Sequence, residues 1–109
     1  MGRPSMTGRV VYTPEAEQQL DHLDDWISDK ASPETAREFV RAVMDHCEGI
    51  LLFPLAGRDR SDIRPGMRTT TFKKRTLIAY AVDESGDEVV VSVLGVFSGG
   101  QDWESTLRV

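Results

Sequence analysis

The sequence predicts an α+β two-layer domain in which a helical hairpin packs on one face of a small antiparallel sheet, in the order β-α-α-β-β-β. Two segments with helical periodicity each follow a start signal, Thr-Pro-Glu or Ser-Pro-Glu. One β-rich run precedes the helices and three follow them. The chain has 109 residues, enough for a single domain with a thin core.

Caps and apolar stripes predict the two helices. Thr13 caps the first, a proline suits its first position, and the helix should end near residues 29–31. Its apolar residues recur at helical spacing, as Ala16, Leu20, Leu23 and Ile27. Ser32 caps a second, more hydrophobic helix, which should run to about Leu52 because Pro54 prevents it from continuing.

Four strands are predicted around this hairpin. They cover Arg9 to Tyr12, Met67 to Lys73, Arg75 to Asp83 and Glu88 to Phe97. A loop rich in Gly and Pro spans residues 54–66, and a turn spans 84–87. Short connections favour an antiparallel meander, and the last strand is apolar enough to be covered by the helices. The tail from Ser98 to Val109 is polar.

Composition places this domain in a reducing compartment. Cys47 is the one cysteine, so no internal disulfide can form, and we expect a cytoplasmic protein. No apolar run reaches the roughly 20 residues of a membrane span, and the start of the chain lacks the apolar region of a secretory signal. Residues 1–7 predict a flexible leader ahead of one domain over residues 8–109.

The net charge of −5 is unevenly divided. Residues 54–75 have a local charge of +5, so the other segments together have −10. A protein that grips nucleic acid over a wide surface is usually basic throughout. This single basic band on an acidic body instead predicts one face directed at an acidic partner, without direct DNA binding.

Candidates for acid–base chemistry or metal binding are few. We assign His22 to the surface of the first helix, and His46 and Cys47 to different faces of the second, with Cys47 an inert core thiol. Tyr80 alternates within a strand and is expected in the core. No Cys-x-x-Cys, His-x-x-x-His or Asp-rich loop is present, so no metal or cofactor is expected.

Several short motifs resemble the RelE/ParE toxin superfamily, and its ParE branch in particular. They are Val11-Tyr12-Thr13-Pro14-Glu15-Ala16, Phe53-Pro54-x-x-Gly57-Arg58, Asp62-x-x-Pro65-Gly66-Met67-Arg68, Ile78-x-Tyr80-x-Val82 and Val93-Leu94-Gly95-Val96. Their order and spacing extend over most of the chain. The resemblance implies a bacterial type II toxin that forms a hetero-oligomer with a cognate antitoxin.

Three functions stay open under this resemblance. ParE-like members are described as inhibitors of DNA gyrase, and RelE-like members as ribosome-dependent mRNA endonucleases. For a nuclease, the matching residues would be Arg68 and Arg75, with Tyr80 as a third candidate. The tail from Phe97 to Trp103 has no Lys, Arg, His or Tyr to complete such a site, which disfavours the nuclease. A degenerate member that binds its antitoxin without toxicity is the third possibility.

The basic band supplies the predicted partner-binding residues, together with one aromatic of the tail. They are Arg58, Arg60, Arg64, Arg68, Lys73, Lys74, Arg75 and Trp103. The alternative is that the charges are ordinary solvated loop residues and that Trp103 is tucked against the sheet. Trp26, at the edge of the first helical stripe, is a further interface candidate. A two-layer domain leaves one sheet face uncovered, and we expect that face to receive the antitoxin.

Overall fold

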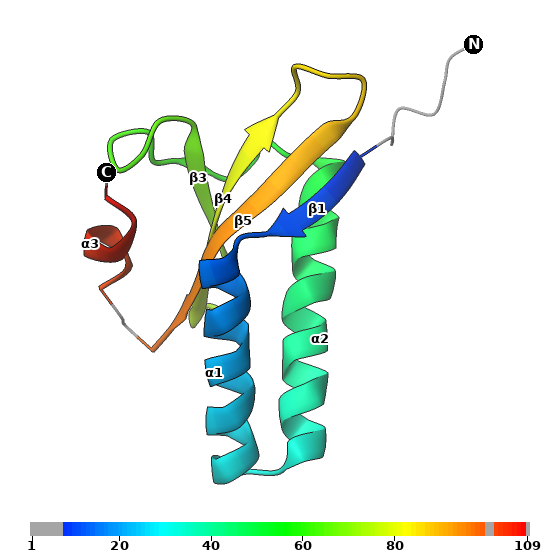
Figure 1. Ribbon diagram of the computed structural model, residues 1–109, viewed down its shortest axis with the longest axis vertical. Coiled ribbons are helices and arrows are strands. Elements are labelled where there is room, and N and C mark those ends of the chain that lie inside the picture. The colour runs from blue at the N-terminus through cyan, green and yellow to red at the C-terminus, as the bar shows by residue number, and fades with distance from the viewer. Residues whose placement is uncertain (1–7, 100–101, 109) are drawn as a thin grey trace.

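The computed structural model describes residues 8–99 and 102–108, and it confirms the predicted fold class: a helical hairpin lies on one face of a five-stranded sheet (Figure 1). The predicted leader, residues 1–7, lies outside the described residues. The elements are β1 (Gly8–Tyr12), α1 (Pro14–Lys30), α2 (Pro33–Gly49), a 3-10 turn (Ile50–Leu52), β2 (Arg58–Asp59), β3 (Met67–Phe72), β4 (Thr76–Asp83), β5 (Val89–Ser98) and α3 (Trp103–Leu107).

Both predicted helix starts are confirmed by their caps. The Thr13 hydroxyl accepts a hydrogen bond from the Ala16 N–H at 3.1 Å, and the Ser32 hydroxyl accepts one from the Thr35 N–H at 3.0 Å. A proline follows each cap at the first helical position, where no N–H is needed. The 3-10 turn after α2 carries the helical path to the predicted end at Leu52.

The sheet is mixed, whereas the sequence predicted an antiparallel one. Its strand order is β1-β5-β4-β3-β2, and the β1–β5 pair is parallel while the other pairs are antiparallel. The partner of β1 lies about 80 positions along the chain, as in the pair Tyr12–Val93, so no local turn fixes its direction. The two-residue strand β2 lies inside the predicted loop and was missed.

Two apolar clusters lie on the two faces of the sheet. The larger one, between helices and sheet, contains Ala16, Leu20, Val43, Cys47, Ile50, Ile78, Tyr80, Val91, Val93 and Val96. The smaller one, on the opposite face, contains Ile63, Met67, Ala79, Phe97 and Leu107, with Trp103 packed against it. The expectation of an uncovered second face is therefore wrong in this region, because α3 and the segment around Ile63 cover it.

The short helix α3 was not predicted, because five residues show no readable periodicity. Asp102 caps it by accepting a hydrogen bond from the Ser105 N–H at 3.3 Å. Arg60 attaches it to the rest of the molecule through Glu104, at 3.3 Å. No helix in the described part of the chain has both the length and the apolar content of a membrane span.

Candidate functional site

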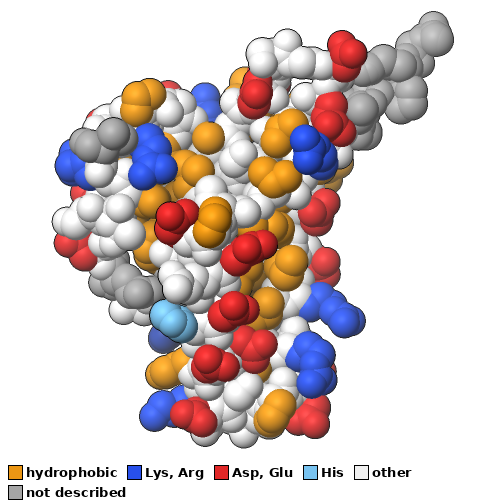
Figure 2. All heavy atoms as spheres, in the orientation of Figure 1, with side chains coloured by type: hydrophobic (Ala, Val, Ile, Leu, Met, Phe, Trp, Pro, Cys, Tyr) orange, Lys and Arg blue, Asp and Glu red, His pale blue; other side chains and the backbone are white. Residues whose placement is uncertain are grey.

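The predicted basic band divides into two separate groups in the folded chain. Arg58, Arg60, Arg64 and Arg68 gather around β2 and the start of β3, whereas the turn between β3 and β4 carries Lys73, Lys74 and Arg75. Five residues of strand, about 17 Å, separate Arg68 from Lys73. Figure 2 shows a group of Lys and Arg side chains beside α3, and acidic side chains gathered over α1. The band is therefore not one continuous face.

Arg60 forms a structural junction with the tail of the chain. Its guanidinium donates to both Asp62 carboxylate oxygens at 2.9 Å and to Glu104 at 3.3 Å, and it lies 5.1 Å from the ring centroid of Trp103. These hydrogen bonds hold the pKa of Asp62 at about 2 and raise the pKa of Arg60. Trp103 is half-buried against the smaller apolar cluster, so it packs against the sheet, which was the alternative to an exposed interface residue.

Arg64 is the second cation held in place by the tail. Its Nε donates to the Leu107 carbonyl oxygen at 3.1 Å, which satisfies a carbonyl at the end of α3. Arg60 and Arg64 thus both hold α3 on the sheet, and their guanidinium groups are already engaged. Arg58, in contrast, is exposed and has no salt bridge to any described residue.

Tyr80 ties the loop after α2 to the sheet. Its side chain is 1% exposed, and its hydroxyl donates to the Pro54 carbonyl at 3.0 Å while accepting from the Gly57 N–H at 3.1 Å. Arg68, directly across from Tyr80 in the β3–β4 register, donates to the Gly57 carbonyl at 2.9 Å. We call Pro54, Gly57, Arg68 and Tyr80 the tyrosine knot. Burial raises the pKa of the Tyr80 hydroxyl above its ordinary value.

The three residues of the nuclease alternative are only partly brought together. Arg68 and Tyr80 are cross-strand neighbours, but Arg75 lies at the other end of β4. Five residues of extended chain, about 17 Å, separate Arg75 from Tyr80. The Tyr80 hydroxyl also donates its one proton in a hydrogen bond to the Pro54 carbonyl. This arrangement suits a structural tie better than a general acid or base.

The tyrosine knot presents an apolar loop that was not among the predicted binding residues. Leu52, Phe53 and Leu55 are 63%, 75% and 53% exposed, on a segment whose carbonyl and N–H groups the knot fixes. Adjacent exposed apolar side chains of this size are typical of binding surfaces. The sequence feature that could have predicted this surface is Phe-Pro-Leu just beyond a helix end, where solvated loops usually carry polar residues.

The remaining titratable candidates are placed as expected. Cys47 is fully buried, and burial raises the pKa of its thiol to about 11, which makes it unreactive near neutral pH. The His46 ring packs beside Phe72, with 5.4 Å between ring centroids. His22 is exposed on α1. Within residues 8–99 and 102–108, no group of three or more His, Cys, Asp or Glu side chains is arranged to hold a metal ion.

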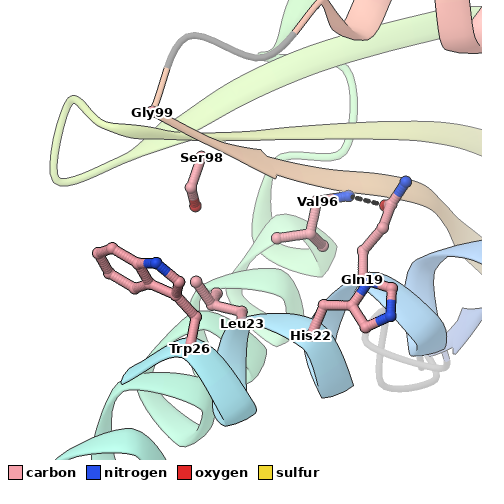
Figure 3. Close-up of a pocket in the computed structure, with 7 residues that line it drawn as sticks. All are labelled: Gln19, His22, Leu23, Trp26, Val96, Ser98 and Gly99. Atoms are coloured by element: carbon pink, nitrogen blue, oxygen red, sulfur yellow. Dashed lines mark hydrogen bonds between the residues drawn. The ribbon is translucent and has the colours of Figure 1, made fainter. Parts of the chain in front are cut away.

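A groove of about 400 Å³ lies between α1 and the end of β5. Strand β1 pairs with β5 only as far as Val93, so α1 borders the rest of this strand edge. Gln19 covers part of it, because its side-chain oxygen accepts a hydrogen bond from the Val96 N–H at 2.7 Å. Figure 3 shows Gln19, Leu23 and Trp26 projecting from α1 toward the end of β5.

Comparisons with known proteins place the chain in one family. A family model described as the ParE toxin of the type II toxin-antitoxin system, parDE, matches residues 10–103. Toxin ParE3 of Caulobacter vibrioides is 30% identical over 84 residues, which are 77% of this chain and 81% of that protein.

Two solved structures share the fold. The chromosomal ParDE TA system from P. aeruginosa contains a chain with a TM-score of 0.69 and 22% identity, covering 86% of this chain and 98% of that one. A YoeB/ParE toxin from Agrobacterium tumefaciens has a TM-score of 0.60 and 15% identity, covering 84% and 98%. The family-model match over residues 10–103 and the 30% identity to Toxin ParE3 establish that the chain belongs to the ParE toxin family of type II toxin-antitoxin systems.

Proposed function

We propose that this protein inhibits DNA gyrase by protein–protein contact in the cytoplasm, and that a cognate antitoxin neutralises it. The family match over residues 10–103 carries the proposal, because inhibition of gyrase is the activity described for ParE-like toxins. The geometry adds a second reason. Tyr80 is committed to the tyrosine knot and Arg75 lies apart from it, which disfavours the nuclease alternative.

The apolar loop Leu52–Leu55 is the surface that we assign to antitoxin binding. Large apolar side chains in a fixed conformation bind well because little conformational entropy remains to be lost. The tyrosine knot supplies that rigidity through three hydrogen bonds of 2.9 to 3.1 Å. Arg58, exposed beside the loop, is placed to attract an acidic antitoxin segment and to increase the association rate.

The gyrase proposal is tested with purified, antitoxin-free protein in two parallel assays. One follows supercoiling of relaxed plasmid by gyrase, and the other follows cleavage of mRNA on translating ribosomes. We expect loss of supercoiling with intact mRNA. Cut mRNA with normal supercoiling would favour the endonuclease alternative, and no effect in either assay would favour a member that binds its antitoxin without toxicity.

The antitoxin surface is tested with a matched pair of substitutions. Phe53→Asp places a charge at the centre of the apolar loop, whereas Met44→Asp does so at a 38% exposed site on α2. Loss of a central apolar anchor costs about 2–4 kcal/mol of binding free energy, which is roughly 30- to 1,000-fold in affinity. We expect this loss for Phe53→Asp alone in calorimetric titration with the antitoxin. Equal affinities of the two variants would exclude the loop as the antitoxin site.

A further inference from the structure

The groove between α1 and β5 has an unusual charge pattern for this acidic helix. Helix α1 carries six carboxylates, yet its groove-lining residues, Gln19, His22, Leu23 and Trp26, include none. Their spacing places them on one stripe of the helix. Trp26 is 61% exposed, so a large part of its indole surface is open to a ligand. The stripe of α1 that lines the groove is thus the face of this helix that would repel an anion least.

Three consecutive cations lie at the end of this groove. The Gly99 N–H donates to the Arg75 carbonyl at 3.4 Å, and Gly99 also lines the groove with Trp26. The turn that carries Lys73, Lys74 and Arg75 is therefore adjacent to the groove. All three side chains are exposed, and none forms a salt bridge with a described residue. The Lys73 ammonium lies 5.4 Å from the Phe72 ring centroid, and no described carboxylate neutralises any of the three charges.

The backbone of this turn disfavours lysine. Lys73 and Lys74 have φ angles of 53° and 64°, and the Arg75 N–H closes the turn by donating to the Phe72 carbonyl at 3.3 Å. Two successive positive φ values are the mark of a type I′ turn, where Asn and Gly are strongly preferred. Non-glycine residues held in this region are concentrated at functional sites. Lysine at both positions indicates that their charges, rather than the turn, are needed.

We propose that this groove binds a single strand of nucleic acid, with a base stacked on Trp26 and neighbouring phosphates held by Lys73, Lys74 and Arg75. Exposed aromatic faces beside a basic track are how proteins hold single strands without sequence preference. A buried protein interface fits less well, because lysine is depleted in interface cores. The volume of about 400 Å³ lies in the range of small-ligand sites.

The negative net charge of the whole protein does not exclude a nucleic-acid site as small as this one. A net charge of −5 argues against a wide nucleic-acid surface, but three phosphate contacts at one groove need only the three cations of the turn. The site is separate from the apolar loop assigned to the antitoxin, and it does not depend on gyrase inhibition.

The stacking contact is tested with a thymidine dodecamer, (dT)12, and the full chain carrying Trp103→Phe. Trp26 is then the single tryptophan, since the sequence has two. We expect saturable quenching of its fluorescence by (dT)12. In fluorescence anisotropy with dye-labelled (dT)12, Trp26→Ala should weaken binding roughly 5- to 100-fold, while Trp26→Phe should retain most of it. Absence of quenching, or equal affinity of Trp26→Ala, would overturn the proposal.

The phosphate contacts are tested by the salt dependence of the same binding. Three phosphate contacts on a single strand predict a slope of log K against log salt of about −2, and Lys73→Asn with Lys74→Gly should reduce it to about −0.7. These substitutions suit the turn, so a loss of binding cannot be ascribed to misfolding. Arg37→Gln with Arg41→Gln removes two exposed cations from α2 and should leave the slope unchanged.

An acidic peptide is the alternative ligand, and one more titration separates it from a nucleic acid. A dodecamer of glutamate, (Glu)12, presents negative charges to the Lys73–Arg75 turn but has no bases to stack on Trp26. We expect it to bind weakly and to leave Trp26 fluorescence unquenched. If (Glu)12 binds as tightly as (dT)12 and loses affinity with the same lysine substitutions, the groove is a peptide site and the proposal fails.

Discussion

Two buried tyrosine hydroxyls provide a direct test of the tyrosine knot. The Tyr80 hydroxyl joins the Pro54 carbonyl and the Gly57 N–H, at 3.0 and 3.1 Å. Tyr80→Phe removes both hydrogen bonds, worth about 1 kcal/mol each, and leaves two backbone groups unsatisfied, so unfolding free energy should fall by about 2–4 kcal/mol. The Tyr12 hydroxyl is buried and makes no hydrogen bond of regular geometry to a described residue; the Cys47 thiol beside it is only a weak hydrogen-bonding group. Tyr12→Phe should therefore leave stability unchanged or raise it by about 1 kcal/mol.

Urea unfolding followed by circular dichroism measures both variants under the same conditions. We expect the transition midpoint of Tyr80→Phe to fall and that of Tyr12→Phe to stay or rise, with the same slope m in both. Thermal unfolding offers a check, since about 1 kcal/mol corresponds to roughly 4–8 °C in a domain of this size. Equal losses in the two variants would refute the reasoning, because the loss would then follow hydroxyl removal rather than hydrogen bonding.

Three further predictions concern packing and titration. Gly57→Ala places a Cβ against the Tyr80 hydroxyl and 2.9 Å from the Thr69 carbonyl oxygen, and it should cost about 1–3 kcal/mol in urea unfolding, whereas Gly49→Ala meets no atom within 4 Å and should cost nothing. The raised pKa of Cys47 means that stability falls as pH rises from 9 to about 11, and that a disulfide reagent at pH 8 reacts only after unfolding. The pKa of Asp62, lowered from 3.8 to about 2 by Arg60, stabilises the fold above pH 4, and this contribution is lost as pH falls through 2. Asp62→Asn should remove that part of the acid dependence.

Local signals in the sequence were sufficient for most of the fold. The caps at Thr13 and Ser32 act within three residues, so the sequence marks both helix starts. The direction of β1 depends on a partner strand near Val93, which no local pattern encodes. Helix α3 is likewise held by distant contacts, chiefly from Arg60 to Glu104. Elements stabilised by tertiary contacts rather than by propensity are those that the sequence missed.

The candidate site was less predictable than the fold. A count of charges marked the basic band, but it could not show that Asp62 and Glu104 engage Arg60, or that β3 separates Arg68 from the cationic turn. The exposure of Phe53 follows from the tyrosine knot, which joins residues more than twenty positions apart. Sequence patterns report residue types, whereas the binding surfaces depend on which of those residues are left without a partner.

The central claim, that this ParE-family protein inhibits DNA gyrase, is tested most directly by gyrase supercoiling of relaxed plasmid with purified, antitoxin-free protein. We expect supercoiling to fall with increasing toxin and to recover when the antitoxin is added. We also expect mRNA on translating ribosomes to stay intact at the same toxin concentration. Normal supercoiling with cleaved mRNA would contradict the claim and return attention to Arg68, Arg75 and Tyr80.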